Sequence, residues 1–294
     1  MSRTLVIGGA GLLGQHLISE AVQRGHEVVA TCRGTPPSRP SAAWRTLDLR
    51  DRDAIRTLVR EVSPALLVNA AAMTDVDGCE ERPEEAQAVN ALAPATFGSA
   101  AKSAGARLVH ASTDYVFDGT GPAAESTDPH PLNVYGRTKL EGERRVLAAD
   151  PRALVVRLSA VFGWNRVSPK SNAVTWILQK VEAGEEVRLF QDQRVTPTYA
   201  KTAAAAVLDL NERDEHGVFH VASRDCVSRL EMGKAIVEAF GIPGAKLVAV
   251  AMGSVALKAP RPLSPCLVVE KVEETLKRPM PEFRTCLEDM RQTR

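Results

Sequence analysis

Two side chains four residues apart have the chemistry of an acid–base pair. Tyr135 and Lys139 lie in the segment YGRTK, at the start of an amphipathic stretch that ends near Ala149. In a helix this spacing places both side chains on one face. An adjacent ammonium group lowers the pKa of a phenol, which is ordinarily near ~10, because it stabilises the phenolate. We therefore expect Lys139 to lower the pKa of Tyr135, and Tyr135 to protonate a carbonyl oxygen.

A hydroxyl group at the end of an apolar segment could complete this pair. The run RLVHAS predicts a strand over 107–112, and Ser112 and Thr113 stand at its carboxyl end. Ligands of open α/β sheets bind at that edge, so either hydroxyl could face a substrate carbonyl, or could instead cap a turn. Asn69 ends the preceding apolar segment, and the small residues 70–72 that follow would let a flat ring approach the backbone.

A glycine-rich turn near the N-terminus predicts a dinucleotide site. The first apolar segment (4–8) continues into GGAGLLG, where Gly8, Gly11 and Gly14 precede and open a helix. Such a turn needs residues without a Cβ, because the pyrophosphate must approach the backbone and the helix N-terminus faces it. A purely structural turn is the alternative, but the position after the first strand favours a dinucleotide. Lys139 would then also bind the nicotinamide ribose.

The end of the second apolar segment indicates which dinucleotide binds. A carboxylate at this place would bond the 2′-hydroxyl of NAD, but residues 30–33 read ATCR. Arg33 could pair with a 2′-phosphate, which favours NADPH and leaves NADH possible; a solvated surface arginine is the alternative. Asp48 and Leu49, at the end of a short third strand expected to end near Leu49, would lie beside the adenine.

The elements that must position these residues alternate between two patterns. Apolar runs without polar alternation are typical of strands covered on both faces, and they occur at 4–8, 27–31, 65–70, 107–112 and 153–158. Amphipathic segments such as 12–25 and 51–62 separate them, the latter opened by Asp51 as an N-cap. This order predicts an α/β fold with a doubly wound parallel sheet.

The second half of the chain has a different texture. Loops and prolines interrupt it after about residue 160. We expect a dinucleotide-binding domain over residues 1–162 and, over 163–294, mainly a smaller α+β substrate-binding cap. The segment 199–222 would return to the sheet through one helix and one strand.

Composition and charge exclude several classes of protein. The 294 residues include 37 Lys+Arg and 36 Asp+Glu, a net charge of +1, so no basic field indicates nucleic acid or a membrane surface as a partner. No apolar run approaches the ~20 residues of a membrane span, and no signal-peptide core is visible. The five cysteines are widely spaced, so we expect neither a zinc site nor a disulfide scaffold, but a reduced, cytoplasmic protein.

Several motifs together resemble one enzyme family. They are the glycine loop, NAAA, STDYVFDG (112–119), NVYGRTKLEGE (133–143) and DQRVTPTYA (192–200). The chain resembles the dTDP-4-dehydrorhamnose reductases, which are extended short-chain dehydrogenases/reductases. The resemblance implies a Rossmann fold with a small C-terminal substrate-binding domain. It also implies NADPH-dependent reduction of the 4-keto group of a dTDP-linked 6-deoxyhexose.

The resemblance also implies roles for individual residues. Catalysis would rest on Thr113, Tyr135 and Lys139. The cofactor would contact Gly8, Gly11, Leu12, Leu13, Gly14, Arg33, Asp48, Leu49, Asn69, Ala70, Ala71, Ala72, Tyr135 and Lys139. The substrate would contact Thr74, Val76, Asp77, Thr113, Asp114, Tyr115, Asn172, Thr196 and Arg261. The planar guanidinium of Arg261 would meet the pyrophosphate of the nucleotide sugar.

The chain departs from the family at two places. The family pattern RPxNSxL is RPLSPCL here, so Ser264 and Pro265 replace an Asn-Ser pair that contacts the sugar. Some members form a magnesium-linked dimer through a glutamate where this chain has Gln15 and His16. We therefore predict no metal, and a homodimer stays open.

Three other functions fit the same motifs. A nucleotide-sugar epimerase shares the Tyr/Lys pair but holds NAD tightly, and Arg33 weighs against it. A reductase of a different carbonyl would differ in the cap residues. A non-catalytic NADP-binding regulatory subunit, like that of methionine adenosyltransferase, would keep the fold without turnover, and the intact Thr113, Tyr135 and Lys139 weigh against that function.

Overall fold

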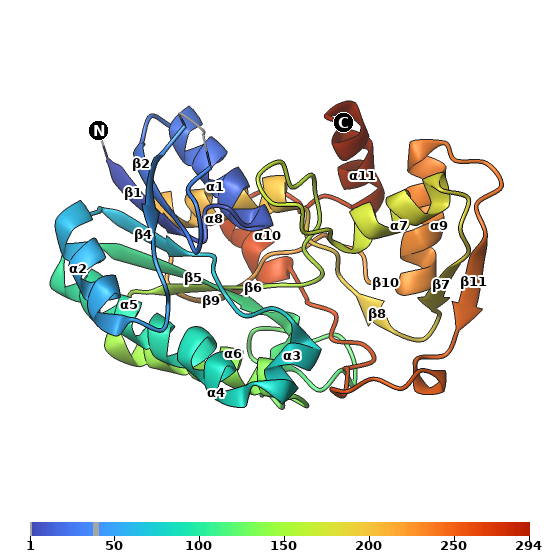
Figure 1. The fold of residues 1–294 in the computed structure, drawn as a ribbon, viewed down its shortest axis with the longest axis horizontal. Coiled ribbons are helices and arrows are strands. Elements are labelled where there is room, and N and C mark those ends of the chain that lie inside the picture. The colour runs from blue at the N-terminus through green and yellow to red at the C-terminus, as the bar shows by residue number, and fades with distance from the viewer. Residues whose placement is uncertain (1, 38–40) are drawn as a thin grey trace.

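A seven-stranded parallel sheet is the largest element of the molecule, which is described here by a computed structural model (Figure 1). The structure describes residues 2–37 and 41–294; Met1 and residues 38–40, part of the predicted domain 1–162, lie outside the described residues. The strands are β1 (Arg3–Ile7), β2 (Glu27–Cys32), β3 (Ala43–Thr46), β4 (Leu66–Asn69), β5 (Arg107–Thr113), β6 (Leu154–Leu158) and β9 (Gly217–His220). Their order is β3-β2-β1-β4-β5-β6-β9, with the direction of winding reversed between β1 and β4. The predicted α/β class with a doubly wound parallel sheet is confirmed.

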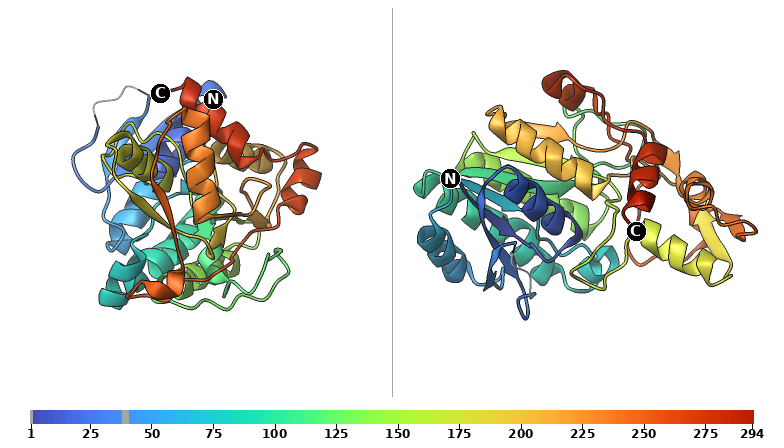
Figure 2. Two further views of the ribbon diagram at one scale, coloured as in Figure 1. Left: turned by 90° about the vertical axis from the view of Figure 1, so that its right-hand side faces the viewer. Right: turned by 90° about the horizontal axis from the view of Figure 1, so that it is seen from above.

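Helices cover both faces of this sheet (Figure 2). The helices on one face are α1 (Leu12–Gln23), α8 (Ala200–Glu212) and α10 (Glu270–Leu276), and those on the other are α2 (Arg52–Val62), α5 (Ala93–Ser103) and α6 (Val134–Ala149). The short helices α3 (Val76–Glu81) and α4 (Pro83–Gln87) and a π-helical turn (Ala88–Leu92) contact α6. In the described part of the chain, no helix has both the length and the apolar character of a membrane span.

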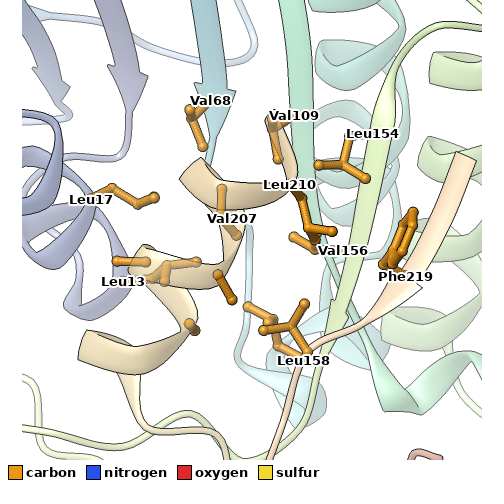
Figure 3. Packing of buried hydrophobic residues seen from close by; sticks show 14 of the residues in the cluster. Leu13, Leu17, Val68, Val109, Leu154, Val156, Leu158, Val207, Leu210 and Phe219 are labelled. Atoms are coloured by element: carbon orange, nitrogen blue, oxygen red, sulfur yellow. The ribbon is translucent and has the colours of Figure 1, made fainter. Parts of the chain in front are cut away.

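Burial on both faces explains why the strand sequences are apolar without alternation. In β4, Leu66 and Val68 pack in the core under α1 and α8, whereas Leu67 packs in the core under α2 and α5. Figure 3 shows Val207 and Leu210 of α8 lying between Leu13 and Leu17 of α1 and strand side chains such as Val109 and Val156, all in one core. Successive side chains of a strand point to opposite faces, so a strand between two helical layers must be apolar at every position.

Capping residues fix where the helices begin. Asp51 accepts hydrogen bonds from the amides of Asp53 and Ala54, which confirms the N-cap expected for α2.

The third strand was expected to continue to Leu49, but β3 ends at Thr46. The reason is a turn in which Asp48 accepts hydrogen bonds from the amide groups of Arg50 and Asp51.

A smaller group of elements lies at the other end of the molecule, on the right in Figure 1. Its elements are α7 (Ala173–Glu182), α9 (Arg229–Phe240), α11 (Phe283–Gln292), the parallel pair β7 (Val187–Phe190) and β11 (Leu247–Val250), and the antiparallel pair β8 (Arg194–Val195) and β10 (Val227–Ser228). These elements share a separate hydrophobic core around Phe162, Ile177, Ile236 and Phe283. The chain therefore has two centres of packing.

The chain crosses between these two parts more than once. Residues 199–222 supply α8 and β9, and β9 pairs with β6 at the edge of the main sheet. Residues 270–276 were expected within the cap, but α10 instead packs on α8 and β9. Val272 and Leu276 are buried in the main core, which explains this placement.

The structure corrects the expectation of wholly reduced cysteines. Cys226 and Cys266 form a disulfide, with Cα atoms 5.8 Å apart. The two residues are 40 positions apart in sequence, and only the fold brings the segment before α9 against the segment after Ser264. Cys32, Cys79 and Cys286 are buried free thiols.

A buried ion pair lies between α6 and the sheet. Arg157 of β6 donates to both carboxylate oxygens of Glu143 of α6, and the two side chains are 4% and 3% exposed. The hydroxyl of Ser112, in β5, also donates to this carboxylate. One acidic side chain thus connects a helix with two strands, and removing its charged partner would leave a buried carboxylate uncompensated.

The substitution Arg157→Met should therefore lower the free energy of unfolding by about 3–5 kcal/mol. Denaturant unfolding of purified protein measures this change. The control is Arg145→Met, which removes an exposed ion pair with Glu141 and should change the stability by about 0.5 kcal/mol or less. Equal stabilities of the two variants would contradict the importance of the buried pair.

Candidate active site

Two adjoining cavities open at the carboxyl ends of the strands, where the winding reverses. The first, of about 510 Å³, is the glycine-loop cavity, and the second, of about 390 Å³, is the Tyr135 cavity. Both are lined by Ala70, Ala72, Thr74 and Lys170, so they meet at the loop after β4. This is the position at which doubly wound folds bind dinucleotides.

Most of the predicted site residues line one of these cavities. The glycine-loop cavity is lined by the predicted residues Gly8, Gly11, Arg33, Asp48, Leu49, Ala70, Ala71, Ala72 and Thr74. The Tyr135 cavity is lined by Leu12, Leu13, Ala70, Ala72, Thr74, Val76, Thr113, Asp114, Tyr115, Tyr135, Lys139 and Asn172. Five predicted residues lie outside both linings: Gly14, Asn69, Asp77, Thr196 and Arg261.

The glycine loop is shaped by close backbone contacts. Gly8 has a φ of +79°, and a Cβ there would lie 2.8 Å from the Cβ of Ala71. A Cβ on Gly14 would lie 2.2 Å from the carbonyl oxygen of Gly8, so Gly14 lets α1 pack on the loop rather than touching a ligand. Thr31 accepts a hydrogen bond from the amide of Gly8 and holds the loop against β2. Any side chain at Gly8 or Gly14 would clash with these neighbours and disrupt the turn.

The loop has the properties of a phosphate site. Its N-cap, Gly11, provides no side chain to accept hydrogen bonds from the first amides of α1, and acidic residues are absent from the first turn. Gly8 and Gly11 both line the cavity. Amide groups at a helix N-terminus favour an anion, so these residues fit the pyrophosphate of a dinucleotide.

The part of this cavity beside the ends of β2 and β3 has three charged side chains. Arg33 is exposed and lines it together with Asp48 and Arg50. The hydrogen bonds from Arg50 and the charge of Arg33 hold the pKa of Asp48 at about 2, so Asp48 is ionised. Arg50 was not anticipated from the sequence, although its place two residues after Asp48 at the strand end is a usable signal. The two guanidinium groups suit a 2′-phosphate.

Asn69 supports the loop instead of lining a cavity. Its side-chain amide lies 3.1 Å from Nδ1 of His110, and its Oδ1 accepts a hydrogen bond from the amide of Ala71. Asn90, in the π-helical turn, holds the next part of the loop by bonding both backbone groups of Met73. Sequence reasoning missed Asn90, because a π-helical turn has no simple residue pattern.

Thr113, Tyr135 and Lys139 converge in the Tyr135 cavity. Thr113 ends β5, and Tyr135 lies in the first turn of α6, whose N-cap Asn133 accepts a hydrogen bond from the Gly136 amide. Of the two hydroxyls left open by the sequence, that of Ser112 donates to Glu143, whereas that of Thr113 donates to Asp114. The Thr113 side chain also hydrogen-bonds Tyr135.

The charge states differ from the expected ones. Burial raises the pKa of Tyr135 above its ordinary value, although the hydrogen bond with Thr113 acts in the opposite direction. The pKa of Tyr135 is thus raised and not lowered as expected, because burial is the largest influence on it. The ammonium group of Lys139 donates to the carbonyl of Ala111 at 2.6 Å. Tyr135 therefore keeps its proton at neutral pH, which is the form that a proton donor needs.

Lys139 is itself strongly affected by its surroundings. It is 2% exposed, and burial lowers its pKa to about 8, while the carboxylate of Glu143 acts to raise it. His110, 3.5 Å from the ammonium, is fully buried, and its pKa is lowered by burial and by Lys139, so it stays neutral. Lys139 can therefore lose its charge only slightly above neutral pH.

Two predicted substrate residues have other partners. Thr196 is buried and accepts a hydrogen bond from the amide of Leu267. Arg261 pairs with Asp77 at 3.0 Å and donates to the carbonyl of Ala259. These contacts shape the segment that follows Ala259 rather than the cavity wall.

The cavity also contains residues that the sequence did not indicate. Arg229, at the start of α9, and Lys170, on the loop before α7, both line the Tyr135 cavity. Lys170 donates to the hydroxyl of Thr74 across the entrance. Neither residue belongs to a recognisable motif, and their positions follow from how the cap folds over the sheet.

Comparison with known proteins places the whole chain in one family. The RmlD substrate binding domain family matches residues 2–294. A probable low-salt glycan biosynthesis reductase, Agl14, of Haloferax volcanii is 36% identical over 92% of this chain and 91% of its own. Methionine adenosyltransferase 2 subunit beta of Xenopus laevis is 33% identical, covering 92% and 82%. The dTDP-4-dehydrorhamnose reductase of Mycolicibacterium smegmatis is 32% identical, covering 98% and 84%.

Solved structures agree with this placement. The dTDP-4-dehydrorhamnose reductase of Clostridium acetobutylicum has a TM-score of 0.87 and 27% identity, with 99% of each chain covered. The fold also matches that of a Bacillus anthracis dTDP-4-dehydrorhamnose reductase solved with NADP, with a TM-score of 0.89, 24% identity, and 100% and 99% of the chains covered. The Rossmann fold with a smaller C-terminal domain is thus shared along the entire chain.

The positive charge of Arg33 in the glycine-loop cavity predicts a cofactor preference. Replacing Arg33 by alanine should weaken NADPH binding about tenfold and leave NADH binding nearly unchanged, because only NADPH has a 2′-phosphate. Fluorescence titration with each cofactor measures both dissociation constants. Arg45→Ala, which removes an exposed arginine outside the cavity, is the control. An unchanged NADPH-to-NADH ratio in Arg33→Ala would remove Arg33 from the site.

The resemblance noted in the sequence is confirmed over its full length. The family match begins at residue 2 and ends at residue 294. Relatives more than 30% identical align over nine-tenths of the chain. This chain belongs to the RmlD family, the family of the dTDP-4-dehydrorhamnose reductases.

Proposed function

We propose that this chain is an NADPH-dependent reductase of the 4-keto group of a dTDP-linked 6-deoxyhexose. The observation that carries the proposal is the meeting of Thr113, Tyr135 and Lys139 in one cavity that adjoins the glycine loop. A proton donor and a dinucleotide site would then lie at the same edge of the sheet. The reductase of Mycolicibacterium smegmatis supports the choice of substrate.

The residues of the glycine-loop cavity would hold the cofactor. Gly8, Gly11 and the first amides of α1 would bind the pyrophosphate, and Arg33 the 2′-phosphate. Leu12, Leu13 and the alanines after β4 would lie beside the nicotinamide, since they line the Tyr135 cavity. When bound, NADPH supplies the hydride that reduces the carbonyl carbon.

The side chains of the Tyr135 cavity supply the proton. The hydroxyl of Thr113 would turn from Asp114 to donate to the carbonyl oxygen, and the protonated phenol of Tyr135 would transfer its proton to that oxygen. The resulting phenolate would be stabilised by the ammonium of Lys139, which lines the same cavity. Lys139 would also donate to the ribose of the cofactor while keeping its hydrogen bond to the carbonyl of Ala111.

The remaining predicted residues would bind the substrate on the cap side. Thr74, Val76, Asp114, Tyr115 and Asn172 line the Tyr135 cavity between the loop after β4 and α7. We propose the dinucleotide-binding domain over 1–162 with 199–222, and the substrate cap mainly over 163–294 apart from α10. The substrate would then lie between the two parts of the molecule.

A second candidate function has support from one relative. Methionine adenosyltransferase 2 subunit beta is 33% identical to this chain, so the fold also occurs in a subunit of another enzyme. A regulatory subunit would bind the dinucleotide without using the phenol of Tyr135. The two functions therefore predict different effects of removing the Tyr135 hydroxyl group. A reductase would lose turnover, whereas a regulatory subunit would still bind the dinucleotide.

The decisive experiment compares wild type with Tyr135→Phe. NADPH oxidation is followed at 340 nm with dTDP-4-dehydrorhamnose generated in situ. We expect turnover in wild type and a loss of about 10²- to 10⁴-fold in the variant, because the proton donor is gone. Tyr199→Phe is the matched control, since the Tyr199 hydroxyl donates to Asp289 outside the Tyr135 cavity. Absent turnover in wild type that still binds NADPH would favour the regulatory subunit.

The lowered pKa of Lys139 predicts how the reduction depends on pH. Below pH about 8 Lys139 carries a proton, and above it the ammonium is lost, while Tyr135 remains protonated. We expect kcat/KM for NADPH to fall roughly tenfold per pH unit above about 8, because this parameter reports the free enzyme. Lys139→Arg, which stays charged, should remove the decline in whatever activity remains. A flat wild-type profile up to pH 10 would contradict the role of the ammonium.

A further inference from the structure

Arg229 is a cation in the Tyr135 cavity that the proposed reaction does not use. It is the first residue of α9, and its side chain lines the cavity with Thr113, Asp114 and Tyr115. Burial lowers the pKa of its guanidinium, against the attraction of Asp114 and Tyr115. A guanidinium stays charged under all ordinary conditions, so this charge must be balanced by its surroundings.

The direct partners of this guanidinium are neutral. Its Nε donates to the side-chain oxygen of Gln193 at 3.1 Å, and its Nη1 lies 3.9 Å from the sulfur of Met232. Among the described residues, no carboxylate lies within ion-pair distance of it. The acid in the same cavity, Asp114, accepts hydrogen bonds from the hydroxyls of Ser159 and Thr113, and burial raises its pKa to about 6. Asp114 thus acts on Arg229 by charge but does not pair with it directly, and the guanidinium has donor groups that no carboxylate of the described residues engages.

The position of Arg229 is fixed before any ligand binds. Gln193 is held in turn by the carbonyl of Pro262, and the Arg229 amide donates to the Gln193 carbonyl. Ser228 and Glu231 form a capping box that fixes the start of α9. The disulfide of Cys226 anchors the preceding residues. A guanidinium held in this way loses little further freedom when it binds.

The other cations near the cavity are less suited to a buried anion. Arg261, the residue expected from the resemblance, is paired with Asp77 and does not line the cavity. Lys170 is exposed at the entrance, where it bonds Thr74. Lys139 donates to Ala111 beside Tyr135. Arg229 is thus the planar donor on the cap side of the cavity.

We propose that Arg229 binds the diphosphate that links nucleoside and sugar in the substrate. The forked geometry of a guanidinium matches two phosphate oxygens, and the phosphate charge compensates the arginine within the cavity. This inference rests on the proposed function, because it requires a nucleotide sugar as the substrate. It transfers to Arg229 the role that the resemblance implied for Arg261.

The test measures dTDP binding by isothermal titration calorimetry to wild type, Arg229→Met and Arg229→Lys. We expect Arg229→Met to bind dTDP about 10- to 100-fold more weakly, as a charged hydrogen-bond donor is lost, and Arg229→Lys to recover part of that affinity. NADPH affinity and melting temperature, measured on the same samples, should stay near the wild-type values. The dTDP affinity of Arg229→Met should also depend less on salt than that of wild type.

Arg224→Met is the matched control, because Arg224 lies five residues earlier, is exposed and pairs with Glu273 away from the cavity. It should bind dTDP like wild type. Equal dTDP affinity in wild type and Arg229→Met would overturn the inference and leave the reductase proposal standing. Failure of wild type to bind dTDP, UDP and GDP alike would overturn both, since no nucleoside diphosphate would then be recognised.

Discussion

The buried carboxylate of Glu143 is the contact on which the geometry of the site depends. It lies one helical turn after Lys139 and receives hydrogen bonds from Ser112 of β5 and Arg157 of β6. Because both strands and the helix contact this one carboxylate, the position of α6 relative to the carboxyl ends of β5 and β6 is fixed. The distance between Thr113, at the end of β5, and Tyr135, in the first turn of α6, depends on that position. An apolar contact would pack as tightly but would not fix one position of α6 along the strands, because the hydrophobic effect is non-directional.

Burial sets the protonation states around this contact. The phenol of Tyr135 and the imidazole of His110 both remain neutral because desolvation disfavours their charged forms. Lys139 and Arg229 are two cations of the same cavity wall, each held by neutral backbone or amide oxygens, and Lys170 and the acid Asp114 line the same cavity. Cationic side chains therefore outnumber the one carboxylate in the cavity lining, that of Asp114, and the proton donor Tyr135 is neutral. Such a pocket is suited to an anionic substrate that must receive a proton.

The fold and the reacting groups could be predicted from the sequence because they depend on local signals. Continuous apolar runs identified the strands, and the spacing of Tyr135 and Lys139 gave their common helix face. The contacts of the cap could not be predicted in this way. Whether Arg261 or Arg229 faces the cavity depends on Asp77 and Gln193, which are distant in sequence. The pairing of Cys226 with Cys266 likewise follows from tertiary contact alone.

The repeated passage of the chain between its two parts restricts how the protein can be divided. A fragment ending at residue 162 would lack α8 and β9, so β6 would become a free edge with unpaired backbone groups, open to association with other chains. The cap cannot be removed as a block either, because α10 lies in the main core between two cap segments. Any opening of the cap must bend several connections at once, which favours small, concerted rotations over a wide hinge motion.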